Sequence, residues 1–301
     1  MAPPCGHPPH SRSPGPKKPA AAAAPPPPHP QLAQQGTRGQ RNPPEQTNLN
    51  YNSTSELISQ AVGGWLTGAL ASALINGLLI LLVQRLPLLT KAGWFHAWCL
   101  GTLLAASIGW RGWGAVVLYL ALGSAVTKLG FAKKESLGIA EARGGRRGPE
   151  NVWGSAATGA LLALATLLPG APKQLLLSGF IASFAAKLGD TFGSEIGKRW
   201  GRSTVSLSQW KPVPPGTDGA VSLEGTLASL AGSLLFSAVG WALKLIPAGQ
   251  IPLITAVAFF ACLIESLIGA ELQPRVSWLS NEAVNGLLTV IAAGLAMVLL
   301  H

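Results

Sequence analysis

The sequence has little charge and almost no aspartate. Charged residues make up 11% of the 301 residues and hydrophobic residues make up 48%, whereas a typical soluble domain has about 25% charged residues. This shortage excludes an ordinary soluble globular protein and indicates an integral membrane protein. The only two aspartates, Asp190 and Asp218, lie within one short stretch, which makes that stretch the first candidate for a site.

Cysteine and histidine are also too scarce to support much chemistry. The three cysteines, Cys5, Cys99 and Cys262, are widely separated and form neither a disulfide framework nor a zinc motif. The five histidines show no metal-binding or triad-like spacing. The Walker pattern, GxxxxGK followed by Ser or Thr, is absent, so a nucleotide site would have to be of another kind.

Basic residues exceed acidic ones, with 22 Lys and Arg against 12 Asp and Glu and a formal net charge of +10. The cations lie in short loops between apolar runs and do not form one basic patch with aromatic residues, which argues against nucleic acid as a ligand. We therefore expect the membrane to be the partner and infer no obligatory protein partner.

Long apolar segments fill most of the chain. About 20 residues are needed to cross a hydrocarbon core of roughly 30 Å, and most of the segments are long enough, although 93–109 and 174–190 are marginal. The sequence predicts an all-α, polytopic transmembrane bundle of seven or eight helices over residues 56–301. The segments lie at about 57–86, 93–109, 111–131, 151–171, 174–190, 220–246, 250–270 and 283–300.

Residues 1–55 have a different composition, rich in Pro, Ala, Gln, Ser and Asn with Glu45 as their only acid. Such a segment cannot bury enough apolar surface to fold, and we interpret it as a disordered tail. The alternative is a targeting segment, because a plastid transit peptide can also be Ser-rich and poor in acids.

The loop charges predict an orientation. With eight segments, the loops after the first, third, fifth and seventh carry most cations, while the opposite loops carry only Arg111, Lys173 and Lys244. The positive-inside rule then places the richest polar loops together on the cytoplasmic or stromal face, with the N-terminus across the membrane. A single site can be assembled on that face.

Residues 187–225 contain the clearest candidate site. In DTFGSEIG, Asp190 and Glu195 end an apolar segment, where a carboxylate at a helix centre costs about 2.5–3.5 kcal/mol. Mg²⁺ binds one or two carboxylates together with substrate oxygens, so we predict that Asp190, Glu195 and Asp218 bind Mg²⁺ and that Lys187 and Arg199 neutralise phosphate charge. The alternative is a capped helix end in which Glu195 pairs with Arg199.

Two Gly-containing loops could bind phosphate. In VPPGTDGAVSLEGT, a turn leads into an apolar segment, whose free N–H groups suit an anion; the alternative is a plain turn before a helix start. The loop at 133–154 offers arginines for bidentate phosphate contacts; the alternative is a loop that only sets topology. The predicted phosphate-binding residues are Arg143, Arg146, Arg147, Asn151, Gly216, Thr217, Gly219 and Ser222.

Further polar residues interrupt the last apolar segments. Glu265 lies within CLIESLIGA, and an intramembrane carboxylate is a functional candidate, although it could pair with Lys187 for structure. In WLSNEAVN, Asn281 and Asn285 share one helix face, with helix capping as the alternative. A secondary transporter could also use such groups, but it would keep its carboxylates near the midplane of the membrane.

Taken in order, KLGDTFGSEIG, VPPGTDGAVSLEGT, ESLIGAELQ, WLSNEAVN and the upstream basic loop resemble the integral-membrane phytyl-phosphate kinase family over about residues 57–301. The resemblance implies CTP-dependent phosphorylation of phytyl phosphate to phytyl diphosphate for tocopherol and phylloquinone synthesis. CTP would be the co-substrate and a prenyl-phosphate lipid the acceptor. It also implies a location in a cyanobacterial membrane or in the plastid envelope or thylakoid.

Overall fold

The computed structural model describes residues 46–301. Most of the predicted tail or targeting segment therefore lies outside the described residues and stays a prediction, while its last ten residues form the first turns of α1. Within the described range, Ser53–His301 form one unit.

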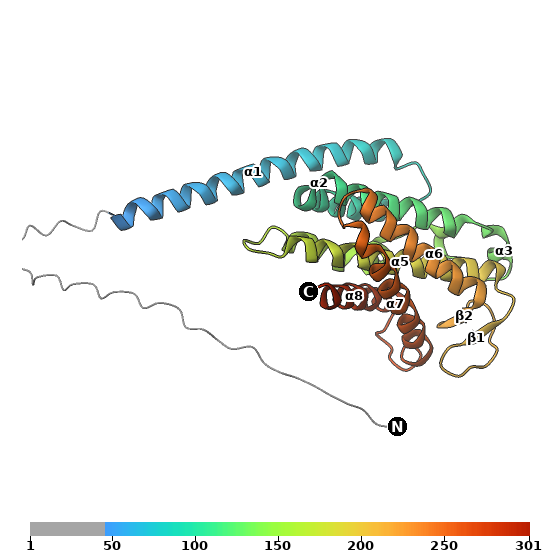
Figure 1. The fold of residues 1–301 in the computed structure, drawn as a ribbon. Coiled ribbons are helices and arrows are strands. Elements are labelled where there is room, and N and C mark those ends of the chain that lie inside the picture. Colours follow the sequence, from blue (N-terminus) through green and yellow to red (C-terminus); the bar gives the residue numbers. More distant parts are fainter. Residues whose placement is uncertain (1–45) are drawn as a thin grey trace, which may run out of the picture. The chain divides into compact units, whose positions relative to one another are not determined.

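Helices dominate the described residues (Figure 1), and six of the helices are long and apolar enough to cross a membrane. The predicted all-α, polytopic class is thus confirmed. A two-stranded antiparallel sheet pairs β1 (Thr204–Ser206) with β2 (Ala220–Ser222), and short 3₁₀ turns occupy Ala142–Gly145 and Ala248–Gln250. The helices are α1 (Gln46–Val83), α2 (Lys91–Lys128), α3 (Phe131–Ser136), α4 (Pro149–Ala165), α5 (Lys173–Trp200), α6 (Leu223–Ala242), α7 (Ile251–Glu271) and α8 (Asn281–Leu300).

α2 is a helical hairpin that reverses at Gly109. This residue has φ 72° and ψ −172°, a conformation that essentially only glycine adopts. Asn76 Nδ2 donates to the carbonyl of Trp98 at 2.9 Å, and Trp113 Nε1 donates to Asn76 Oδ1 at 3.1 Å. On a straight helix Trp98 and Trp113 would be about 22 Å apart, so their shared partner requires the reversal. The two predicted segments 93–109 and 111–131 are therefore the two halves of α2.

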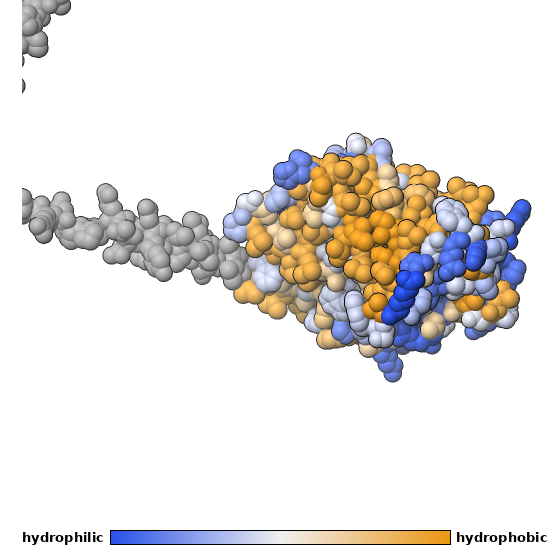
Figure 2. Space-filling view, turned by 90° about the horizontal axis from the view of Figure 1, so that it is seen from below, coloured by the Kyte–Doolittle hydropathy of each residue, from blue (hydrophilic) through white to orange (hydrophobic). Residues whose placement is uncertain are grey.

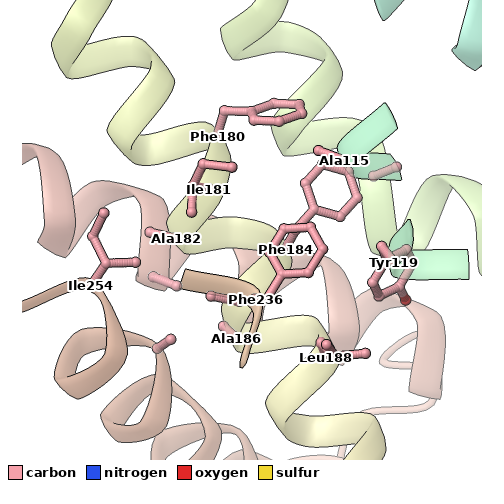
Figure 3. Close-up of a cluster of buried hydrophobic side chains, with 14 of the residues drawn as sticks. Ala115, Tyr119, Phe180, Ile181, Ala182, Phe184, Ala186, Leu188, Phe236 and Ile254 are labelled. Carbon is pink, nitrogen blue, oxygen red and sulfur yellow. The ribbon is translucent and has the colours of Figure 1, made fainter. Parts of the chain in front are cut away.

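α5 is the central helix and packs against α2, α4, α6, α7 and α8. Residues 178–189 are all buried, as expected for a helix that is apolar on every side. Small side chains allow close approach: a Cβ on Gly189 would lie 2.2 Å from Ser233 Oγ of α6. Phe180, Phe184 and the α6 residue Phe236 form an aromatic cluster in the core around it (Figure 3).

The loops after α1, α2, α5 and α7 meet at one end of the bundle, called here the polar end. Leu89 forms a β-bridge with Arg147, Gly216 packs against Ile139, and Gly219 packs against α7. Arg111, Lys173 and Lys244 gather around a different cavity at the opposite end. The alternation predicted from loop charge is thus confirmed, while the orientation in the membrane stays a prediction. Hydrophilic residues gather mainly toward the end at which Figure 1 places β1 and β2 (Figure 2).

Candidate functional site

A cavity of about 300 Å³ opens at the polar end, and all the residues predicted for the site except Arg199 line it. It is framed by the C-terminal halves of α5 and α7, by the N-terminal ends of α4, α6 and α8, and by the loops before α4 and α6. The predicted residues on its wall are Arg143, Arg146, Arg147, Asn151, Lys187, Asp190, Glu195, Gly216, Thr217, Asp218, Gly219, Ser222, Glu265, Asn281 and Asn285.

Arg199 lies outside this cavity, contrary to the prediction. Its guanidinium stacks on the ring of Trp200, 4.8 Å from the centroid, and its side chain packs against Gly130, where a Cβ would lie 2.4 Å from Nε. The last turn of α5 directs this side chain toward the start of α3. Arg199 is therefore not positioned to neutralise phosphate in the cavity, and it does not pair with Glu195.

Lys187 and Asp190 form an ion pair one helical turn apart on α5. Their side chains are 9% and 17% exposed, so each charge is largely removed from water and depends on the other. The hydroxyl of Thr191 donates to the carbonyl of Lys187 at 2.9 Å. The cavity wall thus carries one positive and one negative group deep in the bundle, held by a single rigid helix.

Glu195 is held by a buried lysine on the wall of the cavity. Its carboxylate accepts from Lys134 Nζ, which also donates to the carbonyl of Thr127 at 2.8 Å. Lys198 lies 3.8 Å from the same carboxylate and 3.5 Å from that of Glu141. The prediction that Glu195 binds Mg²⁺ stays a prediction, since its carboxylate, like that of Asp190, lines the cavity and is paired with a lysine. Lys134 counted only as a loop cation in the sequence, and no local pattern indicated a contact with a residue 61 positions away.

Arg147 is fixed by its backbone and points inward. Its N–H donates to the carbonyl of Leu88, and its own carbonyl accepts from the N–H of Thr90, both at 3.0 Å. Nη1 donates to the hydroxyl of Tyr119 at 2.7 Å. Figure 3 shows Tyr119 at the edge of the aromatic cluster with its oxygen directed away from Phe184. Arg147 and Lys187 interact electrostatically with the same tyrosine, so two cations share the inner part of the cavity.

Arg143 occupies the outer part of the cavity. It adopts a left-handed conformation with φ 54°, and its guanidinium donates to Glu150 and, at 3.0 Å, to Asn151 Oδ1. The backbone N–H of Glu150 and then the Arg143 guanidinium lower the pKa of the Glu150 carboxyl. Asn151 Nδ2 donates to Glu282 of α8 at 3.3 Å, which ties the basic loop to the N-terminal ends of α4 and α8.

The PPGTDG turn is held between two other elements. Gly219 has φ 67°, and a Cβ there would lie 2.2 Å from the carbonyl oxygen of Ser266 on α7, so both conformation and space require glycine. Thr217 donates its hydroxyl to the carbonyl of Pro214 at 2.8 Å. Ser222 Oγ accepts from the N–H of Gly225 at 3.1 Å and caps α6. The alternative of a helix start therefore holds for Ser222, while Asp218 has no ion-pair partner among the described side chains.

Besides Glu195, three carboxylates of the cavity are possible metal ligands. Glu265 lies close enough to Asp190 and Asp218 to interact with both electrostatically, and it forms no ion pair with any side chain of residues 65–301, including the predicted partner Lys187. Within that range no group of three His, Cys, Asp or Glu side chains is arranged to hold a metal by itself. Mg²⁺ commonly completes its octahedron with water and phosphate oxygens, so Asp190 and Asp218, with Glu265 nearby, fit a metal that arrives with a nucleotide.

The fold and this cavity define a polytopic membrane protein with a polar site at one end of a helical bundle. Residues 66–293 match the family described as "Integral membrane protein DUF92". The chain belongs to this family, and the resemblance indicated by the linked motifs is confirmed.

Three relatives cover most of the bundle. The chain is 48% identical to an uncharacterised membrane protein of Synechocystis sp. over 231 residues, which are 76% of this chain and 90% of that protein. It is 39% identical to the chloroplastic protein VTE6 of Arabidopsis thaliana over 238 residues, 76% of this chain and 70% of that protein. An uncharacterised membrane protein of Methanocaldococcus jannaschii is 30% identical over 233 residues, 76% of this chain and 93% of that protein.

No solved structure matches this chain. The family and the apolar helices identify it as an integral membrane protein with cyanobacterial and chloroplastic relatives, in agreement with the predicted location.

Proposed function

We propose that the chain is a prenyl-phosphate kinase that transfers a phosphoryl group from CTP, or another nucleoside triphosphate, to phytyl phosphate. The product, phytyl diphosphate, would supply tocopherol and phylloquinone synthesis. The observation that carries the proposal is the polar-end cavity, in which both aspartates of the chain face Lys187 and the basic loop. The 39% identity to chloroplastic VTE6 supports the same assignment.

Each group has a role in this reaction. Asp190 and Asp218 would hold Mg²⁺, which offsets phosphate charge when it is bound with the nucleotide. Lys187 and Arg147 would bind phosphate oxygens in the inner part of the cavity, and Arg143 would do so in the outer part. Because the acceptor is already a phosphate monoester, its oxygen needs no strong base, and the protein contributes positioning and charge neutralisation.

The position of the carboxylates favours this enzyme over a secondary transporter. Asp218 lies in a loop at the polar end, and Asp190 and Glu265 line the same cavity from the C-terminal halves of α5 and α7. A transporter would be expected to keep such groups at the midplane, between discontinuous helices. The break in α2, at Gly109, lies away from this cavity.

Transfer of labelled γ-phosphate from CTP to phytyl phosphate, in membranes containing the full chain, tests the proposal. We expect labelled phytyl diphosphate with the unchanged protein and at least a ~100-fold lower rate with Asp190→Asn or Asp218→Asn, since oriented charge stabilisation contributes on that scale. Glu271→Gln is the matched control, because Glu271 pairs with Arg275 on the surface and does not line the cavity. If folded protein transfers label from no nucleotide to any prenyl phosphate, the kinase proposal is wrong and the secondary transporter becomes the favoured function.

A further inference from the structure

The opposite end of the bundle carries a second cavity, lined by cations and apolar side chains, that the proposed kinase reaction does not use. Three cations line it from three separate connections: Arg111 just after the α2 reversal, Lys173 at the start of α5, and Lys244 just after α6. Two hydroxyl residues, Ser107 and Thr166, complete its polar wall, and no acidic side chain lines it. We call it the opposite-end pocket.

These cations have no ion-pair partner among the side chains that the structure describes. None of the three pairs with an acidic side chain of residues 65–301, so the partial negative charge at the C-terminal ends of α4 and α6 is the only opposite charge described beside the pocket. Loops on the translocated side of a membrane protein normally carry few cations. Arg111, Lys173 and Lys244 are the only cations in the opposite-end loops. Their convergence on one cavity of about 430 Å³ therefore suits an anionic ligand.

The local structure brings the cations together. Gln174 Nε2 donates to the carbonyl of Leu245 at 3.1 Å, which fixes the connection after α6 beside the start of α5. Lys244 itself has φ 57°, in the left-handed position that commonly holds glycine after a helix. A lysine adopts this left-handed conformation less favourably than glycine does. Its side chain lines the pocket. The chain thus places a cation where backbone conformation alone would favour another residue.

The surroundings of the pocket identify the source of the anion. Trp110 and Trp241, which adjoin Arg111 and the end of α6, are 69% and 51% exposed, and exposed tryptophan is typical of the level of lipid headgroups. Leu168, beside the same pocket, is 62% exposed. An anion held between exposed apolar side chains at this depth is best supplied by a lipid.

We propose that the opposite-end pocket binds the phosphate headgroup of an anionic phospholipid in the leaflet across from the polar-end cavity. Lys173, Lys244 and Arg111 would surround the phosphate, with the arginine kept against the Trp110 ring, 5.9 Å from its centroid. The proposal is independent of the kinase reaction, since none of these residues lines the polar-end cavity.

Lipid retention by the purified full chain tests this site. The protein would be exposed to an equal mixture of phosphatidylglycerol and phosphatidylcholine, washed with detergent, and its bound lipid counted by mass spectrometry. We expect preferential retention of phosphatidylglycerol, and a loss of roughly fivefold for each cation removed in the variant Arg111→Gln/Lys173→Gln/Lys244→Gln. The variant Lys91→Gln/Lys133→Gln/Lys211→Gln removes three exposed cations that line neither cavity and should retain the lipid.

A single substitution separates the effect of the Lys244 charge on lipid retention from any effect on folding. Lys244→Gly suits the left-handed turn, so it should keep or raise the thermal stability while lowering phosphatidylglycerol retention. Equal retention by the triple variant and the unchanged protein would overturn the proposal. Binding of inorganic phosphate through the same three cations, without preference for phosphatidylglycerol over phosphatidylcholine, would also overturn it and assign the pocket to a soluble anion.

Discussion

Lys134 and Glu195 form an ion pair that is almost out of contact with water, with side chains 0% and 2% exposed. Removing one partner of such a pair leaves an uncompensated buried charge, whereas replacing both by apolar residues is often tolerated. The pair connects α3 to α5 beside the cavity, and Lys198 links the same carboxylate to Glu141 in the basic loop. These contacts link the loop that precedes α4 to α3 and α5.

Lys134→Met should therefore lower the free energy of unfolding by about 3–5 kcal/mol, as measured by SDS titration of the purified protein in mixed micelles. The double variant Lys134→Met/Glu195→Met should recover most of that loss. Lys133→Met, at the exposed neighbouring position, should change stability by no more than about 0.5 kcal/mol. Equal effects at the two lysines would mean that the buried pair does not stabilise the fold.

Gly219→Ala is expected to damage the site through the turn that carries Asp218. The added Cβ would lie 2.2 Å from a backbone oxygen of α7, so the turn must move and phosphoryl transfer should fall at least about tenfold, since small misplacements have large effects on rate. Gly138→Ala is the matched control, because Gly138 also has a positive φ, 70°, but has open space around it.

A similar loss of activity in Gly138→Ala and Gly219→Ala would attribute the effect to backbone strain alone. In that case contact between the PPGTDG turn and α7 would not be what places Asp218.

At the scale of elements, the α2 hairpin and the central α5 set the geometry. Asn76 is 5% exposed and holds both halves of α2 through its amide. A glycine at the reversal is required by its backbone angles, while Gly114 lies in a helical stretch with open space around it. We therefore expect α2 to tolerate a side chain at Gly114 but not at Gly109.

Gly109→Ala should lower stability by about 1–3 kcal/mol, the usual cost of a sparsely populated backbone conformation. Gly114→Ala should be neutral or stabilising by up to about 1 kcal/mol, because alanine favours helix. Thermal unfolding of the two purified variants distinguishes them, and a harmless Gly109→Ala would show that α2 does not need this glycine to reverse.

The elements were largely predictable because hydrophobic length is a local signal. Each predicted segment corresponds to a helix or to half of α2, and the sites on α5 and the PPGTDG turn were found because acids are rare in this chain. What local patterns could not supply were contacts between distant segments. The Lys134–Glu195 pair, the packing of Arg199 against the start of α3 and the place of Glu265 beside both aspartates all depend on how α3, α5 and α7 pack.

At the scale of the molecule, the bundle has two chemically different ends. The polar end has acids and cations together, whereas the opposite-end pocket is lined by cations without acids. If the positive-inside rule holds, only the polar end faces the cytoplasm or stroma. The side of the membrane on which each loop lies can therefore be tested without knowledge of the reaction.

Single cysteines introduced at Lys211 and Lys244, in a background without the native cysteines, should react with a membrane-impermeant maleimide from opposite sides of sealed vesicles. Lys133→Cys should behave as Lys211→Cys does, since both positions belong to polar-end loops. Labelling of positions 133 and 211 from different sides would exclude a shared site.

The reversal in α2 also has a consequence for biosynthesis. Its halves, residues 91–108 and 110–128, are about 27 and 29 Å long by helical rise, which is marginal for crossing a bilayer alone. They share Asn76 as a partner, and Arg111 follows directly after the turn. We therefore expect the halves to leave the translocon together as one hairpin, so that passage of a single arginine through the hydrocarbon establishes two spans at once.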